Sequence, residues 1–337
     1  MKYTKEKLEK LKNRWTTTKG KRLLKKIKET RCYLSPILYR KVVQNFPHIN
    51  DDEVVDGIDL RGINLAGFDF RVPVLEDESG FEEELAILSY IHFEGATLKH
   101  ATFQDGKVHD CFFENADLSH SSFKGAALNS CSFQNTDMTG TLLGGSNLIN
   151  CNFTDTTIRD INFSTVLTDQ NTIFSEKLKD EKEENFHLAS VQYKQIKEMY
   201  KNSSLHSQAD TYHYREMVSR RKTLKWYNPL RTLNLIFADL TCKYGTSIAR
   251  ILLWITGIVI GFAFIYWTMQ NVLYHNSPTV LSFLDSLYFS LITYATVGYG
   301  DIHPIGDYRL LAGLEGMIGV ILTSLFTVIV ARRIIRD

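Results

Sequence analysis

The sequence predicts a multidomain chain in which a repeat solenoid and a helical linker precede two membrane-spanning helices. Three observations support this fold class. An apolar residue recurs every five positions through the middle of the chain, and two long apolar runs with almost no charge lie near its end. Charge is also unevenly distributed, because residues 1–50 hold fifteen Lys/Arg and three Asp/Glu, whereas residues 51–170 hold six and twenty-one. A length of 337 residues is in keeping with two or three domains.

Residues 1–50 form a basic segment that we expect to be largely helical. The first fifteen residues are charged and lack the apolar core of a signal peptide, so we expect the start of the chain to stay in the cytosol. Two roles for this segment remain open. Its lysines either bind anionic lipid headgroups or dock on the acidic solenoid of a neighbouring subunit, and we favour docking.

Residues 51–174 carry the five-residue repeat. From Phe93 to Phe163 every fifth residue is large and apolar, a mostly small residue stands two positions before it, and the same pattern begins at Leu60. Neither the period of a helix nor that of a strand produces this spacing. The pattern resembles the pentapeptide-repeat family, and the resemblance implies a right-handed quadrilateral β-helix with one repeat on each side. Residues 71–92 break the period, and we expect them to be an insertion.

Three cysteines, Cys111, Cys131 and Cys151, are each separated by one full turn of such a coil, so they are expected to stack on one side. A metal or redox ladder is one interpretation. We favour the other, in which cysteine is a small residue that is easily buried at a tight inward position. A reducing compartment without disulfides fits the odd number of five cysteines.

Two helical segments are expected between the repeats and the first apolar run. Residues 175–228 are predicted to form a helical hairpin linker, which ends where Asn228 precedes a proline. In residues 229–246, apolar side chains recur at helical spacing from Leu230 to Tyr244. We therefore expect an amphipathic helix that lies at the inner surface of the membrane.

Residues 247–337 are predicted to form a pore domain with two membrane spans, at 248–269 and 309–331. Each run is long enough to cross the hydrocarbon core of a bilayer. Lysine and arginine precede the first span and follow the second, whereas only Arg309 lies between them. The excess of positive charge on the cytosolic side of membrane proteins then places both termini in the cytosol and the connecting loop outside.

The loop between the spans contains two further elements. Residues 281–293 are apolar but too short to span, which favours a pore helix that dips into the membrane. Residues 296–300, TVGYG, are expected to return outward in an extended form. Gly298 and Gly300 adopt positive φ at low cost, so successive carbonyl groups are able to face one axis. Irregular backbone at membrane depth is tolerated only where it lines a pore or is buried in protein.

The segment TVGYGD, placed after a short helix and between two spans, resembles the potassium-channel pore family in its two-span form. The resemblance covers about residues 248–336. It implies a selectivity filter formed by four copies of the chain, since one loop supplies only one wall. The implied K⁺ ligands are the backbone carbonyls of Thr296, Val297, Gly298 and Tyr299 with the Thr296 hydroxyl, and Gly300 completes the filter.

The resemblance also implies supporting residues around the filter. Asp301 is expected just outside it. Tyr288 occupies the place where relatives often have a tryptophan that holds this aspartate, and its hydroxyl is able to donate. Ile292 stands where some relatives have a glutamate, so a buried carboxylate partner for Asp301 is missing.

The second span contains three residues whose roles the sequence leaves open. Gly319, or alternatively Gly316, matches the gating hinge of the family, although small residues also allow close helix packing. Glu315 is an acid inside the membrane. Such residues are functional by default, and the alternative is a hydrogen-bonded structural role near the filter.

These observations together predict a tetrameric potassium-selective ion channel that conducts K⁺ passively. The repeat domain is expected to serve assembly or gating. The alternative is a membrane-anchored binding module, either a DNA mimic or a protein-interaction domain, with a secondary pore role. We expect no enzyme and no cofactor, with K⁺ as the transported ion. The expected partners are three further copies, the lipid bilayer and anionic lipids, without nucleic acid. The expected location is the plasma (inner) membrane.

Overall fold

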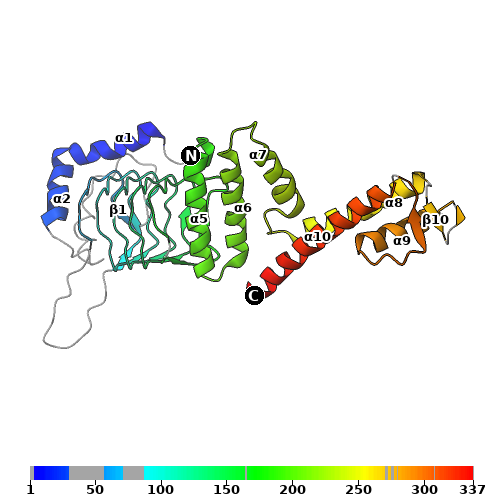
Figure 1. Ribbon diagram of the computed structural model, residues 1–337. Coiled ribbons are helices and arrows are strands. Elements are labelled where there is room, and N and C mark those ends of the chain that lie inside the picture. Colours follow the sequence, from blue (N-terminus) through cyan, green and yellow to red (C-terminus); the bar gives the residue numbers. More distant parts are fainter. Residues whose placement is uncertain are drawn as a thin grey trace, which may run out of the picture. The chain divides into compact units, whose positions relative to one another are not determined.

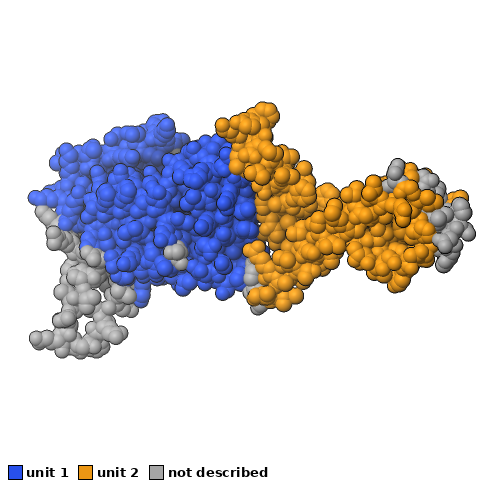
Figure 2. Space-filling model, viewed as in Figure 1, with its two compact units in different colours: residues 1–223 blue, residues 224–337 orange. Residues whose placement is uncertain are grey.

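The chain divides into two compact units, residues 1–223 and residues 224–337 (Figure 2). The computed structural model describes residues 4–29, 57–70, 87–163, 165–269, 272–274, 277–278, 280–306 and 308–336. Two parts of the sequence-based assignments therefore lie outside the described residues. These parts are residues 30–56, which include the end of the basic segment, and residues 71–86 of the expected insertion.

The first unit contains a β-solenoid of about four turns (Figure 1). One side is a parallel five-stranded sheet in which each strand pairs with a strand 20 residues away. Bridges such as His92 to Phe112, Thr97 to Asp117 and Thr102 to Ser122 repeat the same offset on the other sides. The pairing positions along one turn are five residues apart, which makes the coil four-sided and confirms the predicted fold class. The strands of the sheet are β2 (Ile87–Ser89), β4 (Lys107–His109), β5 (Ala127–Asn129), β6 (Asn147–Ile149) and β8 (Leu167–Thr168).

The insertion was expected to cover residues 71–92, but the repeat structure resumes before residue 92. Residues 87–89 form β2 in the main sheet, and β3 (Ile91–His92) pairs in parallel with β1 (Ile58–Asp59). Leu88 is buried five positions before Phe93 and pairs with Val108. The five-residue period thus resumes at Leu88, because that position needs an apolar side chain in the core. A final pair joins β7 (Asn152–Phe153) to β9 (Ile173–Phe174).

Stacked phenylalanine rings fill the solenoid. Phe113, Phe133 and Phe153 form one ladder with ring centroids 5.0 and 4.9 Å apart, and Phe103 and Phe123 belong to a second at 4.5 Å. Rings of the two ladders meet edge to face, the geometry that aromatic quadrupoles favour. The corners between sides lie at positions divisible by five. Many of them have φ between 51° and 74°, and they are mostly Asn, Asp, Gly or His, which tolerate this left-handed conformation.

The three cysteines of the repeat are structural. Cys111, Cys131 and Cys151 are fully buried, and their thiols donate to backbone carbonyl groups. Burial raises the pKa of Cys111 to about 12, so its thiol stays protonated at neutral pH. Within the described residues, no group of three or more His, Cys, Asp or Glu side chains is arranged to hold a metal ion.

The basic helices α1 (Lys5–Asn13), η1 (Arg14–Thr16) and α2 (Thr18–Glu29) cover the first turn of the solenoid. Arg14 donates two hydrogen bonds to Asp59, at 2.9 and 2.7 Å, and Trp15 Nε1 donates to the carbonyl oxygen of Arg61 at 2.8 Å. Gly62 approaches so closely that a Cβ there would lie 2.5 Å from the carbonyl carbon of Leu11. The segment therefore packs on the solenoid of its own chain, and not on that of a neighbouring subunit as expected from its charge.

The helices after the repeats cover the other end of the solenoid. They are α4 (Lys179–Lys182), α5 (Phe186–Asn202) and α6 (His206–Lys222). Tyr193, Ile196 and Met199 of α5 are fully buried in the same core cluster as the phenylalanine ladders. Tyr200 Oη donates to the carbonyl oxygen of Thr172 at 2.6 Å. The predicted linker hairpin is thus part of the solenoid unit, because its apolar face covers the last turn.

The second unit is mainly helical. It begins with α7 (Pro229–Leu233) and the π-helical η2 (Asn234–Leu240), and Asn228 caps α7 through Leu230 N–H. The spans are α8 (Ile248–Met269) and α10 (Tyr308–Arg336), of which α10 continues past the predicted end at 331. Both are long and apolar enough to cross a membrane. Between them lie α9 (Phe283–Tyr294) and a small antiparallel sheet of β10 (Val272–Tyr274), β11 (Ser277–Pro278) and β12 (Ile302–Pro304).

Candidate functional site

The helix α9 holds the candidate site against both spans. Its start is fixed by a capping box, in which Ser282 and Asp285 each accept a hydrogen bond from the backbone of the other. Phe289 and Ile292 on its inner face are buried with Tyr266 of α8. The helix ends at Tyr294, and Thr296 N–H donates to the carbonyl oxygen of Thr293 at 3.0 Å. A helix is therefore present where the pore helix was expected, and it starts two residues later, at Phe283.

Residues 296–300 follow this helix in an irregular form. Thr296, Gly298 and Gly300 have φ of 55°, 51° and 79°, so every second residue is left-handed. A positive φ is costly for a β-branched residue such as Thr296. Val297 N–H and Gly298 N–H both point at the carbonyl oxygen of Ile292, at 2.9 and 3.3 Å, which ties the segment to the last turn of α9. Thr296 Oγ1 donates to the carbonyl oxygen of Ala295 at 2.7 Å.

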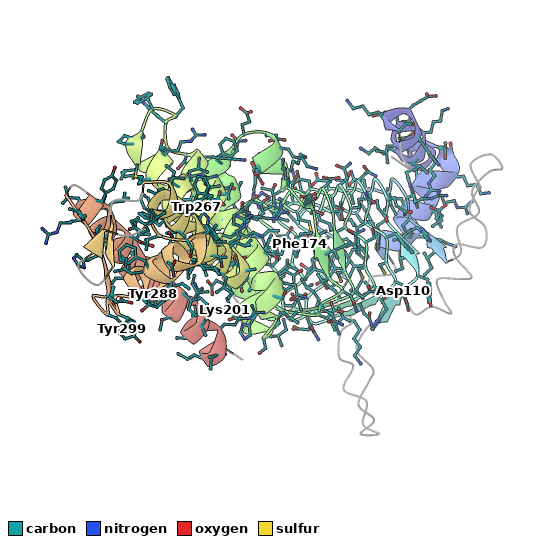
Figure 3. The ribbon with its side chains drawn as sticks, turned by 90° about the vertical axis from the view of Figure 1, so that its right-hand side faces the viewer. Asp110, Phe174, Lys201, Trp267, Tyr288 and Tyr299 are labelled. Carbon is teal, nitrogen blue, oxygen red and sulfur yellow. The ribbon has the colours of Figure 1, made fainter. Side chains whose placement is uncertain are left out.

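Side chains of this segment have little cover from their own chain. Val297 is 53% exposed and Tyr299 is 72% exposed. No heavy atom lies within 4 Å of a Cβ built at Gly298 or Gly300. These glycines are therefore required by their backbone conformation and not by crowding. The side chains of Tyr288 and Tyr299 are labelled in Figure 3, on α9 and on the segment that follows it.

Asp301 and Tyr288 are brought together. Tyr288 Oη donates to Asp301 Oδ2 at 3.0 Å, the contact that the resemblance implied. Asp301 Oδ1 is buried and has no hydrogen-bond partner among the described residues. Ile292, at the position of the missing carboxylate, is buried against Tyr266 and Phe289. Within one chain, Tyr288 therefore supports Asp301 as a hydrogen-bond donor.

The two candidate hinge glycines differ in their surroundings. A Cβ on Gly319 would lie 2.2 Å from the carbonyl oxygen of Tyr294, whereas one on Gly316 would lie 3.6 Å from that of Thr293. Gly319 thus lets α10 approach the C-terminal end of α9 closely. The helix continues without interruption through both glycines. Their role as a hinge stays a prediction.

Glu315 is hydrogen-bonded, as one of the two alternatives for this residue expected, but the sequence did not predict its partners. Glu315 of α10 is fully buried and accepts hydrogen bonds from Tyr266 Oη, at 2.8 Å, and from Ser290 Oγ. The signal in the sequence was the acid itself. Its partners lie 49 and 25 residues away in the chain, so no local pattern indicates them.

The helix before the first span is connected to that span by polar contacts. Trp254 Nε1 of α8 donates to the carbonyl oxygen of Leu240 at 2.9 Å, and the Arg250 guanidinium donates to the carbonyl oxygen of Asp239 at 3.1 Å. Leu230 and Phe237 of the same helix are exposed.

Comparison with known proteins finds a family match for two segments of the chain. Residues 251–336 match the family described as ion channel, and residues 106–181 match the family described as pentapeptide repeat region. The chain thus carries an ion channel domain at its C-terminal end, preceded by a pentapeptide-repeat domain, as the sequence predicted.

Individual relatives cover only part of the chain. Protein LctB of Bacillus caldotenax and Protein LctB of Geobacillus stearothermophilus are each 39% identical over 90 residues, which span 24% of this chain and 65% of the relative. Two solved pentapeptide repeat proteins are also similar. Rfr23 of the cyanobacterium Cyanothece 51142 has 19% identity and a TM-score of 0.20, covering 35% of this chain and 88% of that protein. HetL of Nostoc sp. strain PCC 7120 has 20% identity and a TM-score of 0.22, covering 34% and 55%.

Proposed function

We propose that the chain is one subunit of a homotetrameric, potassium-selective channel that conducts K⁺ passively. The observation that carries the proposal is the backbone of residues 296–300. Left-handed φ values at Thr296, Gly298 and Gly300 alternate along the segment. In the proposed filter, this alternation lets successive carbonyl groups face one side. Rings of such oxygens replace the water around a dehydrated cation when several copies surround one axis.

Four copies are proposed because one chain leaves the filter segment uncovered. The apolar side chains of Val297 and Tyr299 are largely exposed, and Asp301 Oδ1 lacks a partner among the described residues. Irregular backbone at membrane depth needs protein or a water-filled pore around it. Neighbouring copies supply this cover in the proposed assembly.

The proposed location is the plasma (inner) membrane, with both termini in the cytosol. The segment that leads into α7 and η2 fits the inner interface, because Trp226 is 80% exposed and the basic residues Lys225 and Arg231 lie within five positions of it in the sequence. Tryptophan is enriched at such interfaces, and basic side chains there attract anionic headgroups. The contacts of Arg250 and Trp254 then connect this helix to the span that it precedes.

The solenoid is proposed to act in assembly or gating. Its packed core and the helices that cover both ends make a rigid body. Rigid domains transmit movement without bending. Removal of residues 1–223 should change the open fraction or the yield of tetramer, and an unchanged result in both measurements contradicts this role.

The test of conduction uses the purified full chain in liposomes with K⁺ or Na⁺ gradients. We expect K⁺ flux that exceeds Na⁺ flux and is blocked by barium. Gly298→Ala should abolish this discrimination, because alanine resists the φ of 51° at that position. Gly306→Ala is the matched control, since Gly306 also has a positive φ and open space but lies outside the filter. Equal K⁺ and Na⁺ flux in the wild type contradicts the proposal.

A further inference from the structure

Glu315 is an acidic side chain on α10 with an exposed fraction of 0%. Each of its carboxylate oxygens has one donor, because Tyr266 Oη donates to Oε2 and Ser290 Oγ donates to Oε1. No lysine or arginine forms an ion pair with Glu315 in the described part of the chain. A buried carboxylate without a cation is expensive unless its hydrogen bonds are made.

These hydrogen bonds join three helices at one point. Tyr266 belongs to α8, Ser290 to α9 and Glu315 to α10. Ser290 Oγ also lies 2.9 Å from the carbonyl oxygen of Val259, a second acceptor on α8. The Tyr266 ring packs edge-on against Phe289, with centroids 4.8 Å apart. The middle of α9 is therefore fixed to both spans by the Glu315 carboxylate and the groups around it.

The candidate filter, residues 296–300, follows directly after this part of α9. Ser290 lies two residues before Ile292, whose carbonyl oxygen accepts from Val297 N–H and Gly298 N–H. One turn after Glu315, Gly319 contacts the carbonyl oxygen of Tyr294. A rotation or shift of α9 at Ser290 thus moves the acceptor that holds the filter backbone.

We infer that Glu315 is a positioning residue for the ion-conducting segment, which it holds in place through Ser290. The inference rests on the proposed function, since it assigns this residue to the same filter. Glu315 acts as an acceptor of hydrogen bonds, and not as a charge that attracts cations. Its full burial and its two hydroxyl donors support this assignment.

An amide at this position preserves the network. In Glu315→Gln, the amide oxygen accepts from Tyr266, and the amide N–H donates to Ser290 Oγ. Ser290 then donates to the carbonyl oxygen of Val259, which is already within 2.9 Å. Every polar group keeps a partner while the charge is lost. In Glu315→Leu, both hydroxyl groups lose the carboxylate.

The experiment compares K⁺/Na⁺ permeability ratios of the full chain in liposomes. Ser290→Ala and Glu315→Leu should lower the ratio by about tenfold, which corresponds to about 1.4 kcal/mol. Glu315→Gln should keep the wild-type ratio. Ser286→Ala is the matched control, because Ser286 is also fully buried on α9 but, among the described residues, donates to the carbonyl oxygen of Ser282, which caps the same helix. A Glu315→Gln variant that loses as much selectivity as Glu315→Leu overturns the inference.

A second measurement separates this inference from the proposed function. Amide hydrogen exchange at Val297 reports the hydrogen bond to Ile292 whether or not the protein conducts ions. Exchange should be about tenfold faster in Ser290→Ala, for the same free-energy change, and unchanged in Ser286→Ala. Unchanged exchange in Ser290→Ala overturns the positioning role, even if Glu315→Leu fails to fold. Equal K⁺ and Na⁺ flux in the wild type overturns the proposed function instead.

Discussion

Substitution of Gly319 by alanine adds one methyl group where α10 touches the end of α9. The new Cβ would lie 2.2 Å from the carbonyl oxygen of Tyr294, and 3.1 and 3.3 Å from its carbonyl carbon and Cα. Carbon and oxygen atoms in contact lie more than 3 Å apart, so the two backbones must separate by about 1 Å. Because the obstructing atoms belong to the backbone, no side-chain rotation relieves the overlap.

Two opposing effects decide whether Gly319→Ala raises or lowers the stability of the fold. Alanine is favoured over glycine in a helix by about 1 kcal/mol. Overpacking of a well-packed contact costs about 1–3 kcal/mol. The overlap at Gly319 lies towards the upper end of that range, so we expect a net destabilisation of about 1–2 kcal/mol. Gly316→Ala, at 3.6 Å from its nearest atom, and Gly313→Ala, with open space, should be neutral or stabilising.

Thermal unfolding of the full chain in detergent, followed by tryptophan fluorescence, measures this difference. We expect the order of stability to be Gly313→Ala, then Gly316→Ala, then Gly319→Ala. A Gly319→Ala variant that is as stable as Gly313→Ala refutes the packing explanation. If the same variant instead changes the open fraction alone, the hinge prediction for Gly319 is supported.

Two further predictions concern polar contacts. Tyr288→Phe removes the donor to Asp301 and should speed the decay of K⁺ current in planar bilayers by about tenfold, the effect of one hydrogen bond to a charged group. Tyr288→Trp keeps a donor, so its current should decay like that of the wild type. Equal rates of decay in the two variants contradict the role of this hydrogen bond. Burial of Asp59 disfavours its charged form, but hydrogen bonds from Arg14 and Arg61 outweigh this and lower the pKa of the carboxyl group. The contact therefore stabilises the fold above about pH 4 and is lost as the pH falls further, through the lowered pKa. Asp59→Asn should expose α1 and α2 to protease at pH 7 and weaken the acid dependence of their protection, and a wild-type digestion profile at both pH values argues against it.

The solenoid was predictable because the repeat that forms it is visible within a short stretch of sequence. Each side of the coil is five residues long, so the inward residue returns at every fifth position, as from Phe113 to Phe153. The limits of the insertion were harder to place, since only Leu88 precedes Phe93 in the resumed pattern. The packing of α1 and α5 on the two ends depends on contacts between distant residues. An isolated sequence therefore predicts these helices but not the surfaces that they cover.

The same distinction applies to the candidate site. The start of the filter segment is indicated by its own residues, and the contact of Tyr288 with Asp301 followed from the resemblance. The network of Glu315 depends on three helices that meet only after folding. Likewise, the crowding at Gly319 is a property of the Tyr294 backbone and leaves no mark in the residue types around it.

A coil in which each turn is a template for the next has no internal signal to stop growing. Its exposed last turn would offer unpaired N–H and C=O groups to any similar turn nearby. In this chain, Trp15 and Ile27 cover one end of the core and Tyr193 and Tyr200 cover the other. Because these side chains cover the turns that would otherwise pair, we expect the solenoids of neighbouring copies to stay separate and not to join rod to rod.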